Sequence, residues 1–202
     1  MRYYLSSYKI GNKADKLKKM IPKGTSIGLI PNALDYVKLE IRRERNQKTM
    51  KELTDIGISV KMLDLRRYFG KEKELKKKIY DLGGIWVRGG NTFVLRQAMR
   101  LSGLDKILKN MKREDFLYAG YSAGGCVLSP DLEYLQNVDD PTITPYRTKK
   151  VIWKGLGLID YAFLPHYKSD HPESEEIDKE LEYCKKNGIP FKTLRDGEVI
   201  II

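Results

Sequence analysis

The chain has 202 residues, a length that suits one domain, 1–202, with a continuous core and no need of disulfide or metal support. The hydrophobic fraction of 41% is somewhat below the usual range of globular proteins and the charged fraction of 32% is above it, but neither value indicates disorder. Two cysteines exclude a disulfide framework, and no apolar run approaches the roughly 20 residues of a membrane helix, so we expect a cytoplasmic protein without membrane association.

The net charge of +11 raises the question of nucleic-acid binding. The excess lies in four basic runs on segments with helical periodicity, where such runs usually form a solvated face. These runs are 13–19, 42–51, 71–78 and 106–113. They carry no interleaved aromatic residues for base stacking, so we expect no specific nucleic-acid binding.

Apolar runs alternate with amphipathic stretches along the chain. The strands predicted from these runs are Tyr3–Ser6, Ser26–Ile30, Ser59–Leu63, Gly84–Val87, Phe116–Gly120, Tyr161–Leu164 and Glu198–Ile202. The predicted helices are Ala33–Gly57, Lys71–Leu82, Thr92–Leu101, Leu104–Arg113 and Pro172–Asn187. This alternation predicts an α/β fold with a largely parallel sheet and helices on both faces. The last strands are expected to form a C-terminal hairpin around Asp196-Gly197.

A candidate nucleophile follows the fifth of these strands. Gly120-Tyr121-Ser122-Ala123-Gly124 is a Gly-x-Ser-x-Gly sequence between an apolar strand and a short helical run through Leu128. That context is the one in which a strained turn exposes a serine hydroxyl near a helix N-terminus. The alternative is a glycine-rich turn with a capping serine. We predict that Ser122 is catalytic and that Cys126, one helical turn further on, is a small buried residue.

A serine needs a base, and the chain has only two histidines. His166 ends the predicted strand Tyr161–Leu164 and is expected at the carboxyl edge of the same sheet. His171 precedes a predicted helix and is expected to be a loop residue. His166 is therefore the predicted base.

The acidic partner of the base has three candidates. Asp196 lies at the end of a strand and is the first choice, although Asp-Gly could simply form a turn. Asp139 and Asp140, before Pro141, are the alternatives.

Backbone donors for an oxyanion are expected from two turns. Gly89 and Gly90 follow a buried strand and open a helix, and Ala123 directly follows the candidate nucleophile. A Gly-Gly turn could instead bind phosphate, but the segment matches no phosphate-binding fingerprint.

Taken together, these pieces resemble the aspartyl dipeptidase (peptidase E) family, relatives of the class I glutamine amidotransferase fold. The motifs that carry the resemblance are Gly89-Gly90-Asn91-Thr92-Phe93, Gly120-Tyr121-Ser122-Ala123-Gly124, Pro165-His166-Tyr167 and Leu194-Arg195-Asp196-Gly197. The resemblance implies a triad of Ser122, His166 and Asp196, where the founding enzymes use glutamate at the third place. It implies Gly89 and Ala123 as oxyanion donors, and hydrolysis through an acyl-enzyme without a metal or organic cofactor.

The resemblance also implies short peptides as substrates. The family's preference for an N-terminal aspartate depends on basic side chains, including an arginine shortly after the Pro-His motif. Here that stretch is acidic, Pro172-Glu173-Ser174-Glu175-Glu176. Other residues that could supply positive charge are Arg88, Arg147, Lys168 and Arg195.

Two other functions stay open at this point. An esterase or amidase of the α/β-hydrolase type would place its acid before the histidine, as Asp139 or Asp140 would. A non-catalytic relative would bind a partner or nucleic acid through its basic helices. A homodimer is compatible with either, because helix-covered α/β domains occur in both states.

Overall fold

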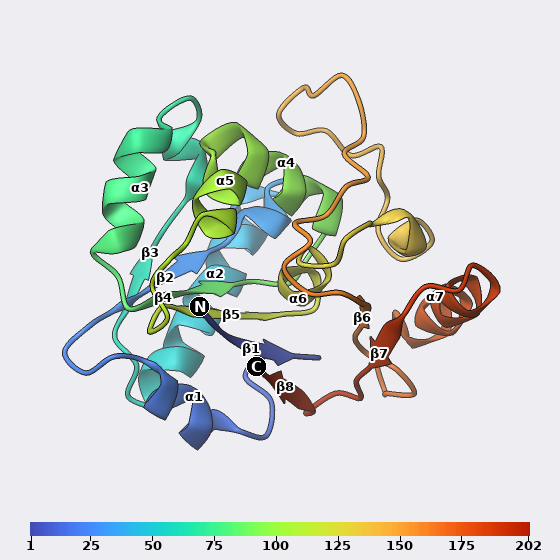
Figure 1. The fold of residues 1–202 in the computed structure, drawn as a ribbon, viewed down its shortest axis with the longest axis horizontal. Helices are drawn as coiled ribbons and strands as arrows, with labels where there is room; N and C mark the ends of the chain where they lie inside the picture. Colours follow the sequence, from blue (N-terminus) through green and yellow to red (C-terminus); the bar gives the residue numbers. More distant parts are fainter.

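The computed structural model describes residues 1–202 and is built on a six-stranded sheet of order β3-β2-β4-β5-β1-β8 (Figure 1). Its strands are β1 (Arg2–Ser6), β2 (Ile27–Ile30), β3 (Val60–Met62), β4 (Gly84–Val87), β5 (Leu117–Tyr121) and β8 (Val199–Ile201). The first five are parallel, and β8 pairs antiparallel with β1 at the edge. The predicted largely parallel α/β sheet is confirmed.

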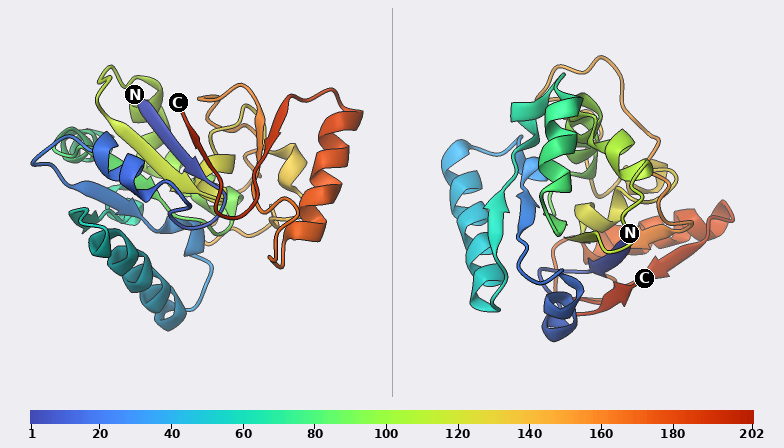
Figure 2. Two further views of the ribbon diagram at one scale, coloured as in Figure 1. Left: turned by 90° about the horizontal axis from the view of Figure 1, so that it is seen from below. Right: turned by 60° about the vertical axis from the view of Figure 1, so that its left-hand side comes forward.

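Helices cover both faces of this sheet (Figure 2). The smaller core lies under α1 (Ala14–Met20) and α2 (Leu39–Asp55). The larger core lies under α3 (Glu72–Tyr80), α4 (Thr92–Ser102) and α5 (Leu104–Lys109). Because side chains alternate along a strand, Ile85 and Val87 enter the larger core and Trp86 enters the smaller one. Burial on both faces explains why these strands are continuous apolar runs.

The predicted helix Ala33–Gly57 is wrong in its first turn. The chain forms a short 3₁₀ turn, η1 (Asn32–Leu34), before α2 begins at Leu39. Between them the buried Asp35 carboxylate accepts hydrogen bonds from Asn32, Arg42 and Tyr146. A polar cluster with partners far apart in sequence therefore decides the backbone here, against local helical periodicity. A further turn, η2 (Leu65–Tyr68), follows β3.

The predicted C-terminal hairpin is also wrong. The strand before Asp196 is β7 (Phe191–Thr193), which pairs in parallel with β6 (Ala162–Leu164) in a separate two-stranded sheet. The helix α7 (Ser174–Lys186) connects β6 to β7, and such a crossover makes neighbouring strands parallel. The Asp196-Gly197 turn then carries the chain to β8 in the main sheet.

From the sequence we expected His166 to end a strand of the main sheet, and this prediction is wrong. His166 follows β6, and Asp196 follows β7, two neighbouring parallel strands with Leu164 opposite Thr193. Parallel strands present their carboxyl ends at one edge, so both side chains leave the small sheet together.

The small sheet is fixed against the short helix α6 (Ala123–Cys126), which follows β5. The Phe163 ring packs so closely on this helix that a Cβ at Gly125 would lie 2.6 Å from it. A third 3₁₀ turn, η3 (Glu133–Leu135), supplies Tyr134, whose hydroxyl donates to the Phe163 carbonyl at 3.1 Å. These contacts bring the end of β6 to the start of α6. None of the helices combines the length and apolar character needed to cross a bilayer.

Candidate active site

Ser122 occupies a strained turn between β5 and α6. Its φ of 48° and ψ of −117° lie outside the regions that L-residues favour. Such a conformation costs on the order of 1–3 kcal/mol and persists only where the surrounding structure enforces it. The predicted elbow between strand and helix is therefore present in the fold.

Glycine is required two residues before and two residues after Ser122, because the elbow packs directly on β4. A Cβ at Gly124 would lie 2.3 Å from the carbonyl oxygen of Val87, and one at Gly120 would lie 2.9 Å from the same atom. The buried Tyr118 hydroxyl donates to the Gly124 carbonyl at 2.7 Å and fixes the turn from below. Cys126, in the same helix, is buried, and burial raises the pKa of its thiol well above the usual range, as expected of a structural cysteine.

His166 and Asp196 form a direct pair. The Nδ1 of His166 lies 2.7 Å from Oδ1 of Asp196, and the His166 side chain is 1% exposed. Ser7, at the end of β1, joins the two residues: its hydroxyl donates to Asp196 at 2.8 Å and accepts from the His166 backbone N–H at 2.8 Å. A carboxylate on Nδ1 places the proton there and leaves Nε2 free to accept one.

The environment of His166 favours the neutral imidazole. Burial, and secondarily His171, lowers the pKa of His166 to about 4, although Asp196 opposes the shift. The two imidazole rings are stacked, with centroids 3.6 Å apart and planes within 8°. Tyr8 packs edge-on against both rings. A neutral ring at physiological pH is the form that can act as a base.

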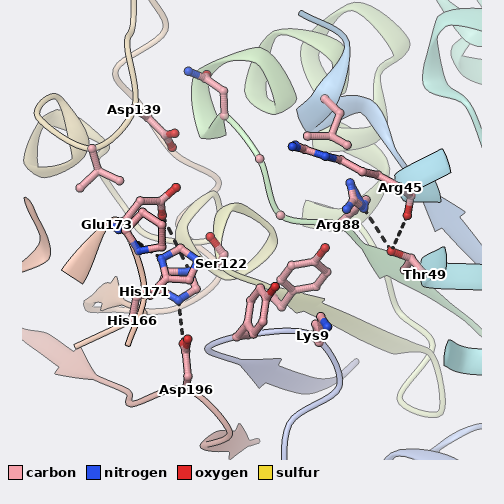
Figure 3. A pocket seen from close by; sticks show the side chains of 18 of the residues that line it. Lys9, Arg45, Thr49, Arg88, Ser122, Asp139, His166, His171, Glu173 and Asp196 are labelled. Atoms are coloured by element: carbon pink, nitrogen blue, oxygen red, sulfur yellow. Dashed lines mark hydrogen bonds and ion pairs between the residues drawn. The ribbon is translucent and has the colours of Figure 1, made fainter. Parts of the chain in front are cut away.

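The Nε2 of His166 faces Glu173 rather than Ser122 in this structure. The Glu173 Oε2 lies 3.8 Å from Nε2, and no hydrogen bond joins Ser122 to His166. Burial raises the pKa of Glu173 to about 7, with a further contribution from Asp139. Ser122 lies beside this group in Figure 3, within the same cavity.

The predicted backbone donors lie around the serine. A Cβ at Gly89 would come within 3.2 Å of the Ser122 Cβ, so this loop passes directly over the elbow. The backbone N–H groups of Gly89, Gly90 and Ala123 have no acceptor within the protein. Unpaired N–H groups at this position are suited to a developing negative charge.

The alternative acids do not reach His166. Asp139 accepts a hydrogen bond from the Thr92 backbone N–H at the start of α4, at 2.8 Å. Asp140 accepts from Thr142 in its own loop. Of the three candidates, only Asp196 contacts the histidine.

A cavity of about 740 Å³ joins these groups. One wall holds the histidines, Glu173 and Asp139, and the other holds basic side chains (Figure 3). The basic residues lining it are Lys9, Arg45, Lys48 and Arg88. Arg88 donates through Nε to Thr49, while its buried Nη1 has no hydrogen-bond partner. Arg147, Lys168 and Arg195, the other basic residues considered from sequence, do not line the cavity.

The one group of side chains that could hold a metal lies in this cavity. His166, His171 and Glu173 offer donor atoms that lie within 4.8 Å of one another. The two rings are nearly parallel, however, and an imidazole binds an ion in its own plane. Both histidines could therefore bind one ion only after His171 rotated.

The sequence profile of peptidase family S51 matches residues 7–202. The chain belongs to peptidase family S51. It is therefore a serine-type peptidase, and the expected resemblance to peptidase E is confirmed. An uncharacterized peptidase of Listeria monocytogenes is 31% identical over 173 residues, covering 83% of this chain and 78% of the relative. Peptidase E of Streptomyces coelicolor is 27% identical over 188 residues, covering 91% of this chain and 70% of that one.

A solved structure shares the fold of this S51 peptidase. A Listeria monocytogenes protein provisionally named peptidase E superposes with a TM-score of 0.74 at 24% identity, covering 100% of this chain and 97% of that one. A peptidase from an acI-B1 actinobacterium superposes with a TM-score of 0.68 at 18% identity, covering 100% and 82%. At these identities the likeness shows the fold alone.

Several residues of the S51 site were missed from the sequence. Glu173 was read only as part of an acidic stretch, and His171 as a loop residue, yet both contact His166. Ser7 directly follows β1 and Arg45 lies in α2, both far from the motifs in sequence. Only Glu173 could have been predicted to lie near the site. It follows His171 by two residues and His166 by seven, directly before a predicted helix.

Proposed function

We propose that this peptidase hydrolyses short peptides through an acyl-enzyme on Ser122, with His166 as base and Asp196 as its orienting partner. The observation that carries the proposal is the placement of a strained elbow serine and a buried His–Asp pair in one cavity. No other pair of a histidine and a carboxylate in the chain combines that burial with a direct hydrogen bond.

The reaction follows from these positions. Neutral His166 takes the Ser122 proton on Nε2 while Oγ attacks the scissile carbonyl carbon, and its oxygen becomes negative. The free N–H groups of Gly89 and Ala123, with Gly90 beside them, receive that charge. The protonated imidazole then gives its proton to the departing amine, and an ester remains on Ser122. Water, deprotonated by His166, releases the acid and restores the serine.

We further propose that the basic wall selects an acidic side chain on the first residue of the peptide. Arg88 lines the cavity, and its guanidinium forms no ion pair with a carboxylate of the protein. A carboxylate of the substrate would supply that partner, and Arg45 and Lys48 add positive charge to the same wall.

A panel of dipeptides tests this function. The dipeptides Asp-Leu, Ala-Leu and Lys-Leu differ only in the first side chain, and hydrolysis of each releases leucine. The value of kcat/KM for Asp-Leu should exceed that for Ala-Leu by about 10-fold or more, since an ionic hydrogen bond contributes roughly 1.5–3 kcal/mol. Arg88→Gln should reduce that preference and leave Ala-Leu hydrolysis within about twofold. Free leucine is quantified by mass spectrometry. Hydrolysis of esters but of no peptide in a wider panel would rule the proposal out.

A further inference from the structure

We infer that Ser7 is a positioning residue that holds the base and its acid in register with the nucleophile. The inference rests on the proposed triad of Ser122, His166 and Asp196 and adds a fourth side chain to it. Ser7 directly follows β1 of the main sheet and is fully buried. It does not line the cavity, so any effect on the reaction must pass through the residues that it contacts.

The triad is divided between two sheets. Ser122 follows β5 of the main sheet, whereas His166 and Asp196 follow β6 and β7 of the small sheet. A displacement of about 1 Å between reacting groups can cost about 10²-fold in rate. The site therefore needs a connection that fixes the carboxyl ends of the small sheet against the elbow.

The end of β1 supplies this connection. The carbonyl oxygen of Ser6 accepts a hydrogen bond from the backbone N–H of Ser122 at 3.3 Å. The next residue, Ser7, directs its hydroxyl to the small sheet. There it donates to Oδ1 of Asp196 and accepts from the backbone N–H of His166, both at 2.8 Å. Two adjacent residues thus hold the nucleophile on one side and the His–Asp pair on the other.

The backbone of His166 needs such support. Its φ of 60° lies in the left-handed region, which is unfavourable for a residue with a side chain. A residue keeps a strained conformation only where the surrounding contacts enforce it. The buried hydrogen bond from its backbone N–H to the Ser7 hydroxyl is one of these contacts. Loss of the hydroxyl would free the backbone that aims the imidazole at Ser122.

The carboxylate of Asp196 is held at one oxygen by two donors. Its Oδ1 accepts from the Ser7 hydroxyl and from Nδ1 of His166. The hydroxyl has one proton, and its other acceptor, the Leu194 carbonyl, is more distant at 3.3 Å and already accepts from the Tyr167 backbone N–H. Donation to the charged carboxylate is therefore favoured. Because the Asp196 side chain is 23% exposed, the hydroxyl also keeps it from turning toward water.

Removal of the hydroxyl in Ser7→Ala tests this role. Labelling of Ser122 by a fluorophosphonate probe should slow about 30-fold, because the base is no longer held in line with the serine. With Asp-Leu as substrate, kcat should fall by a similar factor while KM stays within about twofold, since Ser7 lies outside the cavity. Ser7→Cys keeps a weak donor and acceptor and should slow labelling about 5-fold.

A double-mutant cycle with His166→Ala separates positioning from a general structural role. Both contacts of Ser7 act through the imidazole, so adding Ser7→Ala to His166→Ala should slow the residual labelling by no more than about twofold. The matched control is Ser102→Ala. Ser102 is a buried serine at the end of α4 whose hydroxyl also donates to a carbonyl and accepts from a backbone N–H. This variant should label at the wild-type rate.

The outcomes separate this inference from the function on which it rests. Wild-type labelling in Ser7→Ala, or an equal loss in the His166→Ala background, would overturn the positioning role and leave the triad intact. Absence of both labelling and peptide hydrolysis in the wild type would instead reject the proposed function. All rates are measured where thermal melts show each variant to be folded, and Ser7→Cys is judged by the same criteria if Ser7→Ala does not fold.

Discussion

Replacing Asp196 by asparagine should lower kcat for peptide hydrolysis by about 10⁴-fold, the loss that the same change causes in unrelated serine proteases. The carboxylate accepts the Nδ1 proton of His166 at 2.7 Å. An asparagine can turn its NH₂ toward Nδ1, which moves the imidazole proton to Nε2. The ring then has no lone pair to take the Ser122 proton.

The controls for this prediction use the other two candidate acids. Asp139→Ala and Asp140→Ala should retain the chemical step, because neither carboxylate contacts His166 and each bonds to a backbone N–H elsewhere. Ser7 and His166 bond to the same Asp196 oxygen, so the Ser7 hydroxyl must accept from the asparagine NH₂ and donate instead to the Leu194 carbonyl, 3.3 Å away. Since Ser7 keeps a partner, the melting temperature of Asp196→Asn should stay close to the wild type. Full activity in Asp196→Asn, with loss only at position 139 or 140, would show that the acid precedes the histidine in the chain.

Replacing Gly124 by alanine should disable the elbow. The added Cβ would meet the Val87 carbonyl oxygen at 2.3 Å, and this backbone atom belongs to the centre of the sheet. Relief of the clash must shift the turn that carries Ser122. We expect a loss of about 1–3 kcal/mol in the free energy of unfolding, as in overpacked cores. A displacement of about 1 Å at the nucleophile would reduce kcat by about 10²-fold.

The matched control is Gly24→Ala, in a turn far from the site. A Cβ there meets nothing within 4 Å, but the φ of +74° makes any side chain costly. It should lose about 1 kcal/mol of stability and keep wild-type kcat. Urea denaturation gives the free energies, and kcat is measured where each variant is fully folded. Wild-type kcat and stability in Gly124→Ala would show that the elbow does not depend on this close approach.

The parts of the site that the sequence predicted are the local ones. Residues 120–124 contain strand end, turn and helix start in one short segment, so the position of Ser122 depended on no distant pairing. Gly89 and Gly90 were predictable for the same reason, since a buried strand precedes them and a helix follows. In both cases nearest neighbours along the chain decide the geometry.

The errors concern pairing between distant segments. His166 and Asp196 were placed at strand ends, which is correct, but in the wrong sheet. Asp196-Gly197 has the local chemistry of a hairpin, and only the crossover through α7 makes β6 and β7 parallel partners. Ser7 reaches His166 and Asp196 through contacts that the tertiary fold creates, and no spacing in the sequence encodes them.

The central claim, an activated serine at position 122, is tested most directly with a fluorophosphonate probe and peptide mapping by mass spectrometry. The wild-type protein should carry one adduct, on Ser122, and labelling should be abolished in Ser122→Ala and strongly slowed in His166→Ala. Absence of labelling in the folded wild-type protein, or an adduct on another residue that survives in Ser122→Ala, would contradict the account.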